Sequence, residues 1–437
     1  MIRLPVLNVV DVAERQMCCG CGVCAYLEPE RIEMVDTLDY GRRPTLRGSA
    51  ADPLGDERAG DAMLACPGVG LAHSSPSAPE GASAALMPGW GPVLRLWEGH
   101  ASDPELRWAG SSGGAASALA LYCIEREGMH GALHVRARDD VPYLNRTVLS
   151  RSREEILAAT GSRYAPASPC DGLAMVESAP SPCVMIGKPC DVAAARLASE
   201  RRPALKEKIG ALIAFFCAGT PSTKGTLEMF KAMGIADPTG IASVRYRGNG
   251  WPGNATVVVR TPTGTETRSL TYAQSWGDVL QKYRQWRCFV CADHTGEFAD
   301  IAVGDPWYRT IEPGEAGTSL ILARTARGKE LVEGAIAAGY LVARVVEERI
   351  LPASQPNLLA GRGAVWGRIA ALRLFGIPAP RYTNMPLFRW WRSELSLKAK
   401  AQSLYGTFKR AFTKRLFQRH RVDEFESPIA LREPTKD

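Results

Sequence analysis

Residues 183–198, CVMIGKPCDVAAARLA, combine a short apolar run, a turn and an alanine-rich segment. We predict a strand over 182–187, a tight Gly-Lys-Pro turn and a helix that begins near Asp191, because a short apolar run bounded by Gly and Pro is typical of a buried strand. Residues 209–234, IGALIAFFCAGTPSTKGTLEMFKAMG, repeat the arrangement, with Cys217 at the strand end and a helix from about Ser222. The repeat indicates an α/β fold with a parallel or mixed sheet.

The composition is that of a soluble globular protein with two or three domains. The 437 residues are 46% hydrophobic and 23% charged, which is ordinary for this class. The opening residues, MIRLPVLNVVDVAERQ, have no export-signal pattern, and no apolar run reaches the roughly 18 residues of a membrane span. We therefore expect a cytoplasmic protein whose twelve cysteines serve metals or redox chemistry more than disulfides.

The positive charge is concentrated near one end of the sequence. Lys and Arg number 53 and Asp and Glu 46, a net charge of +7. Residues 387–422 hold ten of these Lys and Arg residues and only one Glu, so the rest of the chain is close to neutral. Nucleic-acid enzymes spread basic residues over their working face. We therefore expect no nucleic-acid partner.

The first set of cysteines lies in MCCGCGVCAYLEPERI, residues 17–32. Cys18, Cys21 and Cys24 have C-x2-C-x2-C spacing, and Cys66 precedes a proline, as in bacterial ferredoxins. Cys66 follows much later than the usual three residues, and Cys19 is left over. The alternative is a structural zinc site, although zinc sites favour cysteine pairs.

The second set of cysteines is dispersed. Cys190 and Cys217 follow two predicted parallel strands, whose carboxyl ends meet at one edge of a sheet. Cys288 and Cys291 come from RCFVCADHTGEFADIAVGDPW, residues 287–307. Together the four can form a second cluster site; taken singly, each is an ordinary buried thiol.

These motifs carry a family resemblance. GKPC, FFCAGTPS, YRGNGWPG and the 287–307 segment resemble the beta subunits of coenzyme F420 hydrogenases and dehydrogenases, over about residues 15–360. The same family includes 7-hydroxymethyl chlorophyll a reductase and ferredoxin-dependent divinyl chlorophyllide 8-vinyl reductase. The resemblance implies FAD and two [4Fe–4S] clusters. It assigns an inner cluster, nearest the flavin, to Cys190, Cys217, Cys288 and Cys291 (the inner set), and an outer, ferredoxin-like cluster to Cys18, Cys21, Cys24 and Cys66 (the outer set).

Two small-residue loops are candidates for the flavin site. Gly110–Gly114 leads into a predicted helix that runs to about Glu127, and such a helix start suits a pyrophosphate; tight packing of the helix start is the alternative. The resemblance places this loop, and the turn Gly161–Tyr164, beside the flavin; an exposed surface turn is the alternative for the second. At these positions Arg163 can neutralise flavin or phosphate charge and Tyr164 can stack on the ring. Lys188 can stabilise a reduced, anionic flavin, although family members often have an uncharged residue there. The predicted cofactor-binding residues are Ser111, Ser112, Gly113, Gly114, Gly161, Ser162, Arg163, Tyr164 and Lys188.

Few side chains are candidate proton donors. We consider Lys188, Asp293 and His294, but favour a structural role for Asp293 and a solvated loop position for His294. No Ser-His-Asp or metal-hydrolase pattern is present. The remaining chemistry is electron transfer.

The basic segment 387–422 predicts an amphipathic helix. Tyr405, Phe408, Phe412 and Leu416 recur at helical spacing, with Lys and Arg between them. Peripheral contact with an anionic membrane, packing on the chain's own domain, and docking of an acidic partner such as ferredoxin are three alternatives.

We predict three parts: a ferredoxin-like module over 1–75, a FAD- and [4Fe–4S]-binding catalytic domain over 76–380, and a basic amphipathic tail over 381–437. The first functional hypothesis is a reductase that passes electrons from a ferredoxin-like donor through two [4Fe–4S] clusters to FAD and a small organic acceptor. The alternatives are an electron-transfer beta subunit that reduces a deazaflavin coenzyme, a redox enzyme of bacterial surface-polysaccharide biosynthesis, and a zinc-binding scaffold without enzymatic activity.

Overall fold

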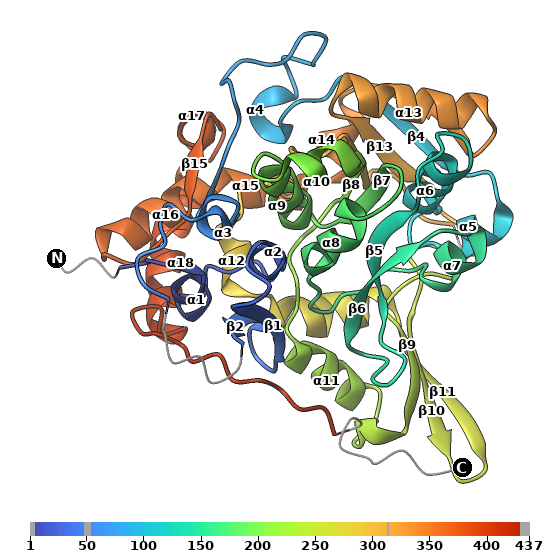
Figure 1. Ribbon diagram of the computed structural model, residues 1–437, viewed down its shortest axis with the longest axis horizontal. Coiled ribbons are helices and arrows are strands. Elements are labelled where there is room, and N and C mark those ends of the chain that lie inside the picture. The colour runs from blue at the N-terminus through green and yellow to red at the C-terminus, as the bar shows by residue number, and fades with distance from the viewer. Residues whose placement is uncertain (1–4, 48–53, 313, 429–437) are drawn as a thin grey trace.

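A mixed eight-stranded sheet forms the centre of the molecule (Figure 1). The computed structural model describes residues 5–47, 54–312 and 314–428. Four adjacent strands, β12, β8, β7 and β5, run parallel, and antiparallel strands extend the sheet on both sides. In spatial order the strands are β14 (Leu341–Val345), β4 (Arg95–Ala101), β13 (Ser319–Ala323), β12 (Ile301–Gly304), β8 (Ile209–Phe215), β7 (Cys183–Gly187), β5 (Ala132–Ala137) and β6 (Asn145–Ser150).

Helices cover both faces of this sheet. Successive side chains of a strand point to opposite faces, and in β8 Leu212 packs into one core cluster while Ala211 and Ile213 pack into the other. Both faces are buried, which explains the near-continuous apolar runs of the central strands. One face is covered by α6 (Ala115–Glu125) and α13 (Ala326–Ala337), and the other by α8 (Leu173–Glu177), α9 (Pro189–Ser199) and α10 (Pro203–Lys208).

The two strand–turn–helix units are confirmed. β7 ends at Gly187 and α9 begins at Pro189, so Cys190 lies in the first turn of the helix. The Asp191 carboxylate accepts the Lys188 backbone N–H at 3.0 Å, which caps the start of α9. β8 is followed by α11 (Thr223–Ala232), with Ser222 at its N-cap. The predicted helix after Gly114 is α6.

The first part of the chain packs between the central domain and the C-terminal segment. It contains α1 (Val9–Glu14), α2 (Val23–Leu27), the hairpin β1 (Ile32–Thr37) and β2 (Gly41–Leu46), α3 (Asp61–Leu64) and β3 (Gly70–Ala72). Cys18, Cys24 and Cys66 share a small apolar cluster with Val12, whereas Cys21 belongs to the main core. β3 pairs with β15 (Arg381–Thr383), so this part and the C-terminal segment share a small sheet.

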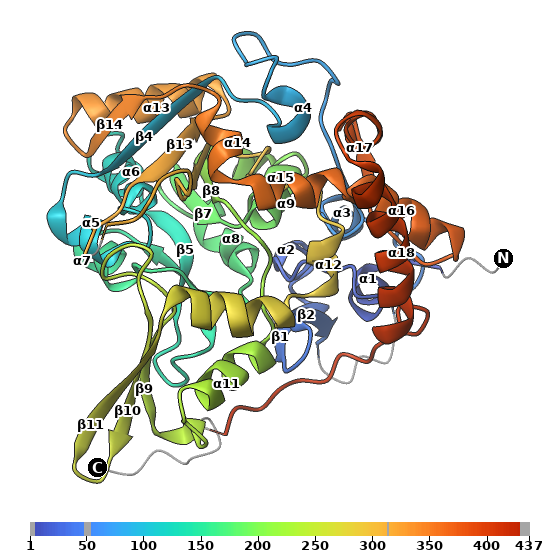
Figure 2. The same ribbon diagram turned by 180° about the vertical axis from the view of Figure 1, so that it is seen from behind.

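A separate three-stranded sheet projects from the body (Figure 2). It consists of β9 (Ile241–Arg245), β10 (Ala255–Thr261) and β11 (Gly264–Leu270), and α11 packs beside it. The remaining helices are α4 (Met87–Trp90), α5 (Pro104–Ala109), α7 (Arg153–Ala158), α12 (Trp286–Phe289), α14 (Ile350–Ser354), α15 (Pro356–Gly363), α16 (Val365–Leu374), α17 (Leu387–Ser393) and α18 (Leu397–Thr413), together with the short π-helix Ala273–Val279 and the 3-10 turns Pro169–Gly172, Pro238–Gly240 and Leu280–Tyr283.

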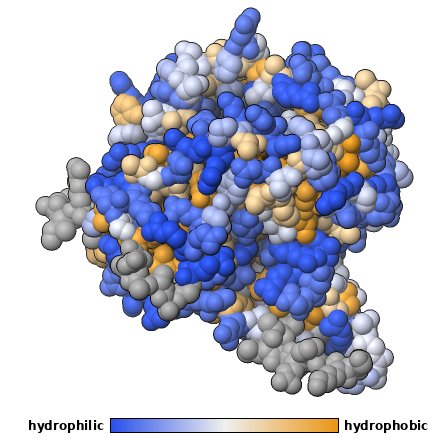
Figure 3. All heavy atoms as spheres, in the orientation of Figure 1, coloured by the Kyte–Doolittle hydropathy of each residue, from blue (hydrophilic) through white to orange (hydrophobic). Residues whose placement is uncertain are grey.

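The predicted basic helix is α18, and it packs beside α16. Its buried side chains are Ser403, Thr407 and Ala411, whereas Phe408 and Phe412 are exposed. No described helix has the length and apolar character that crossing a bilayer requires. The face of the molecule seen in Figure 3 is mainly hydrophilic, with apolar residues scattered over it. The last tail residues, 429–437, lie outside the described residues.

Candidate functional site

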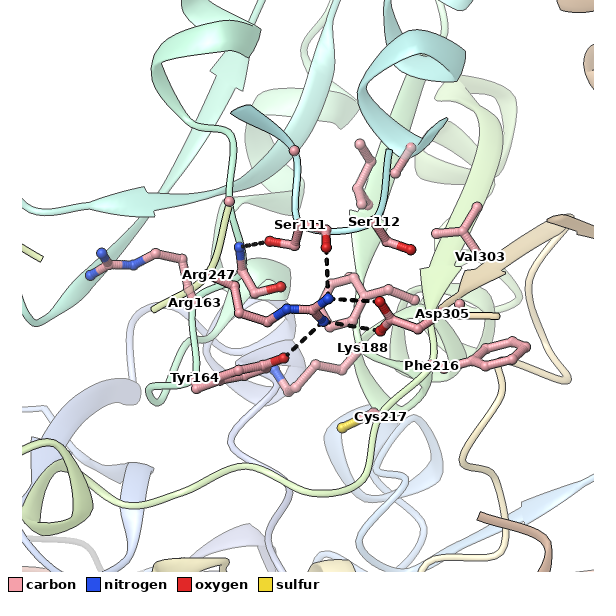
Figure 4. Close-up of a pocket in the computed structure, with 18 of the residues that line it drawn as sticks. Ser111, Ser112, Arg163, Tyr164, Lys188, Phe216, Cys217, Arg247, Val303 and Asp305 are labelled. Atoms are coloured by element: carbon pink, nitrogen blue, oxygen red, sulfur yellow. Dashed lines mark hydrogen bonds and ion pairs between the residues drawn. The ribbon is translucent and has the colours of Figure 1, made fainter. Parts of the chain in front are cut away.

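A pocket with a volume of about 300 Å³ opens at the carboxyl ends of β7, β8 and β12. These strands bring Lys188, Phe216 and Asp305 to one edge of the sheet (Figure 4). The first turn of α6 and the turn after α7 complete the walls. The carboxyl edge of the parallel strands is where open α/β sheets bind ligands.

The pocket collects eight of the nine predicted cofactor-binding residues. Those in its lining are Ser111, Ser112, Gly114, Gly161, Ser162, Arg163, Tyr164 and Lys188. Gly113 is outside the lining. It has a φ of 69°, and a Cβ there would meet Gly317 O at 2.7 Å, so Gly113 lets the loop pack against the backbone before β13. The two loops, 51 residues apart, join directly because the Ser162 N–H donates to Ser111 Oγ at 2.6 Å.

Arg163 is not available to a phosphate or flavin, so its expected role in charge neutralisation is wrong. Its Nε donates to Asn145 Oδ1 at 2.7 Å, and its two other nitrogens donate to the carbonyls of Val244 and Pro142 at 2.8 Å. Figure 4 shows the side chain pointing away from the pocket centre. The guanidinium instead ties the 161–165 turn to β9 and to the loop before β6.

The cation that faces the pocket is Arg247, which the sequence analysis did not single out. It is 3% exposed, and its Nη2 donates to Asp305 Oδ1 at 2.7 Å and to the Ser111 carbonyl at 2.7 Å. Burial opposes the charge on Arg247, but Asp305 more than offsets burial, and the pKa of Arg247 is raised. In the sequence, only the positions of Arg247 in the YRGNGWPG motif and of Asp305 in the turn after Gly304 could have pointed to this ion pair.

An aromatic wall surrounds this ion pair. The Arg247 guanidinium lies 5.0 Å from the Tyr272 ring centroid and 5.6 Å from that of Trp307. Trp251 stacks on Trp307 at 5.1 Å and donates its Nε1–H to Asp305 at 2.7 Å. Tyr164 lies in the lining with its hydroxyl 3.3 Å from Arg247 Nη1. The pocket therefore offers flat apolar surfaces beside a buried cation, a combination suited to an aromatic anionic ligand.

Lys188 lies at the bottom of the pocket in an ion pair with Asp191. The Nζ–Oδ2 distance is 2.6 Å, and both side chains are buried. Burial alone would lower the pKa of Lys188, but the Asp191 carboxylate more than offsets it, so the ammonium is retained and its pKa is raised. The second carboxylate oxygen, Asp191 Oδ1, is buried and has no hydrogen-bond partner among the described residues. It is a free acceptor at the pocket wall.

The inner set gathers directly beside the pocket. Cys217 lines the pocket itself, and the Thr220 N–H donates to Cys288 Sγ at 3.4 Å. The pKa of Cys217 is raised by burial and then by its neighbours Cys288 and Cys190. Burial also raises the pKa of Cys291; the nearby Arg287 opposes this shift, and Cys190 adds to it. The fold thus brings these four cysteines, which are dispersed in the sequence, into one electrostatically coupled group.

The outer set forms a second group. Burial, followed by Cys18, Cys21 and Cys66, raises the pKa of Cys24. Burial and the neighbours Cys21 and Cys18 raise the pKa of Cys66 to about 12. The late Cys66 therefore joins the triplet in space. Among the described residues, no three His, Cys, Asp or Glu side chains are arranged around a single metal ion.

Cys19 and Arg287 link the two groups. The neighbouring thiol of the leftover Cys19, followed by burial, raises the pKa of Cys190. Arg287 is 3% exposed and donates from Nη2 to the Pro67 carbonyl at 2.8 Å. Its Nε and Nη1 have no hydrogen-bond partner, and no carboxylate pairs with it among the residues described. An uncompensated buried cation is costly, so this position favours an anionic group between the thiols.

The other two proton-donor candidates, Asp293 and His294, are hydrogen-bonded to the backbone of the protein. Both carboxylate oxygens of Asp293 accept backbone N–H groups, including that of Gly296 at 2.7 Å, as a structural turn requires. The expectation of a solvated His294 is wrong: Nδ1 contacts the Cys217 carbonyl at 2.9 Å and Nε2 is buried. Burial lowers the pKa of His294 to about 4, so the imidazole is neutral.

Comparisons with known proteins place this geometry in a family. The C-terminal model of "Coenzyme F420 hydrogenase/dehydrogenase, beta subunit" matches residues 182–349, and the N-terminal model matches 96–174. Together they cover more than half of the chain and all the walls of the pocket except its α15 edge. The chain belongs to the coenzyme F420 hydrogenase/dehydrogenase beta-subunit family. Members of this family are subunits of redox enzymes, and the predicted resemblance is confirmed.

Two relatives from methanogens show how far the similarity extends. The chain is 24% identical over 243 residues to the F420-dependent formate dehydrogenase 1 subunit beta of Methanococcus maripaludis, which covers 55% of this chain and 59% of that subunit. It is also 24% identical over 255 residues to the coenzyme F420 hydrogenase subunit beta of Methanosarcina barkeri. This match covers 57% of this chain and 81% of that subunit. The chain thus spans less than two thirds of the formate dehydrogenase subunit.

A solved structure has the same fold. A chain of the F420-reducing [NiFe] hydrogenase complex from Methanosarcina barkeri superposes with a TM-score of 0.53 at 21% identity, over 67% of this chain and 97% of that one. The similarity confirms the mixed α/β architecture. At 21% identity, this similarity is evidence for the fold and not for the function.

Proposed function

We propose that this chain is an electron-transfer beta subunit that carries FAD and two [4Fe–4S] clusters and reduces a deazaflavin coenzyme. The observation that carries the proposal is the double position of Cys217, which lines the pocket and belongs to the inner set. A redox group held by the inner set would lie against any ring bound in the pocket. Family membership and the names of both relatives support the deazaflavin acceptor over a self-contained reductase.

The donor chemistry fits iron–sulfur clusters. Cys190, Cys217, Cys288 and Cys291 would hold the inner cluster, and Cys18, Cys21, Cys24 and Cys66 the outer one. Four cysteine thiolates are the usual ligands of a [4Fe–4S] cluster, and each set supplies four. Backbone N–H groups reach Cys288 Sγ and Cys18 Sγ, at 3.4 and 3.2 Å, and such bonds adjust cluster potentials. Arg287 would neutralise part of the negative charge.

The pocket would hold FAD through three kinds of contact. The first turn of α6 presents the positive end of the helix to a pyrophosphate. Tyr272 and Trp307 offer faces for a ring, and the free oxygen of Asp191 can accept from a ring N–H. Lys188 keeps a positive charge beside the ring without contributing a net charge, since Asp191 balances it. When bound, these cofactors exchange single electrons at the clusters and electron pairs at the flavin.

A ferredoxin-linked reductase of a small organic acceptor is the second candidate. It is favoured by the position of Cys19, which lies close to Cys21 and Cys66 of the outer set and to Cys190 of the inner set within this one chain. A ferredoxin-like donor would then deliver electrons to the outer cluster.

Anaerobic purification tests the proposal. We expect about eight iron atoms and one FAD per chain, and no stoichiometric zinc. The chemically reduced protein, freed of reductant, should transfer its electrons to the oxidised deazaflavin coenzyme. Cys217→Ser should lower the iron content and slow this transfer, whereas Cys123→Ser, at a buried thiol in α6, should change neither. A colourless protein rich in zinc would refute the cofactors. An iron–flavin protein that ignores the deazaflavin would refute the acceptor and favour the second candidate.

A further inference from the structure

Helix α18 presents an apolar stripe to the outside of the molecule. Its inner side packs on α16 through small side chains, Ser403, Thr407 and Ala411. The stripe repeats at intervals of three and four residues along one flank, so its members share a face of the helix. The exposed fractions are 83% for Leu397, 38% for Leu404, 73% for Tyr405, 37% for Phe408 and 55% for Phe412.

The stripe is part of the main concentration of exposed apolar side chains. Of thirteen large hydrophobic residues exposed among those described, seven lie between residues 374 and 412; Leu374 and Phe388 are the two outside α18. Aromatic contacts make the surface continuous, since the Phe408 ring lies 4.9 Å from both Phe375 and Phe412. An exposed apolar surface of this kind marks an interaction site.

Unpaired cations border the stripe. Arg389, Arg392, Lys398, Lys409 and Arg415 make no ion pair with any described residue. The segment 387–422 carries a local charge of about +9, against roughly −2 for the rest of the chain, from ten Lys and Arg and one Glu. α18 itself contains no acidic residue. The complementary surface is therefore apolar and anionic.

We propose that α18 docks this protein on an anionic lipid bilayer, with the helix axis parallel to the surface. The helix is about 25 Å long at 1.5 Å per residue and lies at an outer edge of the molecule beside α16 and α17 (Figure 2). The stripe enters the boundary between headgroups and acyl chains, and the bordering cations contact lipid phosphates. The docking is independent of the proposed redox function.

A bilayer fits this surface better than a protein partner. A second copy of the chain would bring two segments of like charge together, which Coulomb repulsion opposes. An acidic protein would match the charge, but Leu397 and Tyr405, at 83% and 73% exposed, project from the helix and do not line a recess that could hold a partner's anchoring side chains. A fluid layer of anionic headgroups meets both the ridge of apolar side chains and the surrounding cations.

Vesicle sedimentation tests the inference on the full chain. We expect binding to vesicles of phosphatidylcholine with 30% phosphatidylglycerol (about a third anionic lipid) and at least tenfold weaker binding to pure phosphatidylcholine. The triple variant Leu397→Ser, Tyr405→Ser, Phe412→Ser should reduce binding at least tenfold, because three exposed apolar side chains lose their transfer into lipid. Lys398→Gln with Lys409→Gln should weaken binding and its salt dependence.

The control is Val342→Ser with Val345→Ser. These side chains of β14 are 54% and 50% exposed and lie across the molecule from α18. The control should bind like the wild type. Failure of the wild type to sediment with anionic vesicles, or equal sedimentation of the triple variant, would overturn the inference. The inference would also be overturned if the wild type did not bind vesicles and instead formed a stable dimer, or a complex with an acidic ferredoxin, that the triple variant abolishes and the control variant does not.

Discussion

The buried pair Arg247–Asp305 allows a quantitative test of the pocket. Asp305 accepts from Arg247 Nη2 and Nη1 at 2.7 and 3.0 Å and from Trp251 Nε1 at 2.7 Å. The Arg247 side chain is 3% exposed and that of Asp305 18%. Asp305→Ala would leave the guanidinium buried beside two aromatic rings without a counter-charge.

The expected loss in the free energy of unfolding is about 3–5 kcal/mol, the cost of breaking a buried ion pair on one side. Asp305→Asn keeps one oxygen to accept from Trp251 and Arg247 Nη2 but loses the charge and the second acceptor, so we expect a smaller loss of about 2 kcal/mol. The double variant Arg247→Met, Asp305→Leu removes both charges and should recover part of the loss. The three variants therefore separate the cost of an unpaired cation from the value of the pair.

Urea unfolding followed by tryptophan fluorescence measures these differences, since Trp251 contacts the pair directly. The urea midpoint should fall with an unchanged slope. Asp56→Asn, which removes a surface partner of Arg58, is the control and should leave the midpoint unchanged. A loss below about 1 kcal/mol for Asp305→Ala, or a double variant that is no more stable than Asp305→Ala, would refute the view that Arg247 depends on Asp305.

Three further predictions follow from the same structure. Cys217→Ser should remove about half of the bound iron, measured on anaerobic protein, if the two thiol sets hold separate clusters; full iron content in this variant, or an equal loss in Cys123→Ser, would contradict the inner set. Burial lowers the pKa of His134, so the unfolded chain binds a proton there that the folded protein does not; stability should fall as the pH drops below about 6.5, and His134→Gln should flatten that part of the stability profile. Gly113→Ala should lower the melting temperature and flavin occupancy, because a Cβ would meet Gly317 O at 2.7 Å; Gly81→Ala has a similar φ but open space around its Cβ, and an equal effect there would trace the loss to φ alone.

Local patterns were sufficient for the elements that frame the site. The strand and helix around Cys190 follow from an apolar run, a proline at the first helical position and the Asp191 cap. The proximity of Cys190 and Cys217 could be predicted because parallel strands end at one edge of the sheet, whereas Cys288 and Cys291 were assigned to the inner set by the family resemblance. The family, too, could be inferred from motif order.

Tail packing could not be read from the amphipathic pattern. The sequence spacing selects an apolar face made of Tyr405, Phe408, Phe412 and Leu416, and a helix usually buries such a face. Of these side chains only Leu416 is buried, and it lies beyond the end of α18. In the structure the face toward α16 is instead Ser403, Thr407 and Ala411, which allow the two helices to approach closely. Helical periodicity shows which residues share a face, and the neighbouring element determines which face is covered.

The sequence by itself determined the α/β elements, the closely spaced triplet Cys18, Cys21 and Cys24, and the glycine-rich turns, because each depends on residues a few positions apart. Only the tertiary structure decided that Arg163 is consumed by backbone carbonyls while Arg247 serves the pocket, and that Arg287 lies unpaired between the thiols. Every arginine is charged and long, so its role is set by the acceptors within reach of its guanidinium. Those acceptors come from segments distant in sequence, and only folding brings them together.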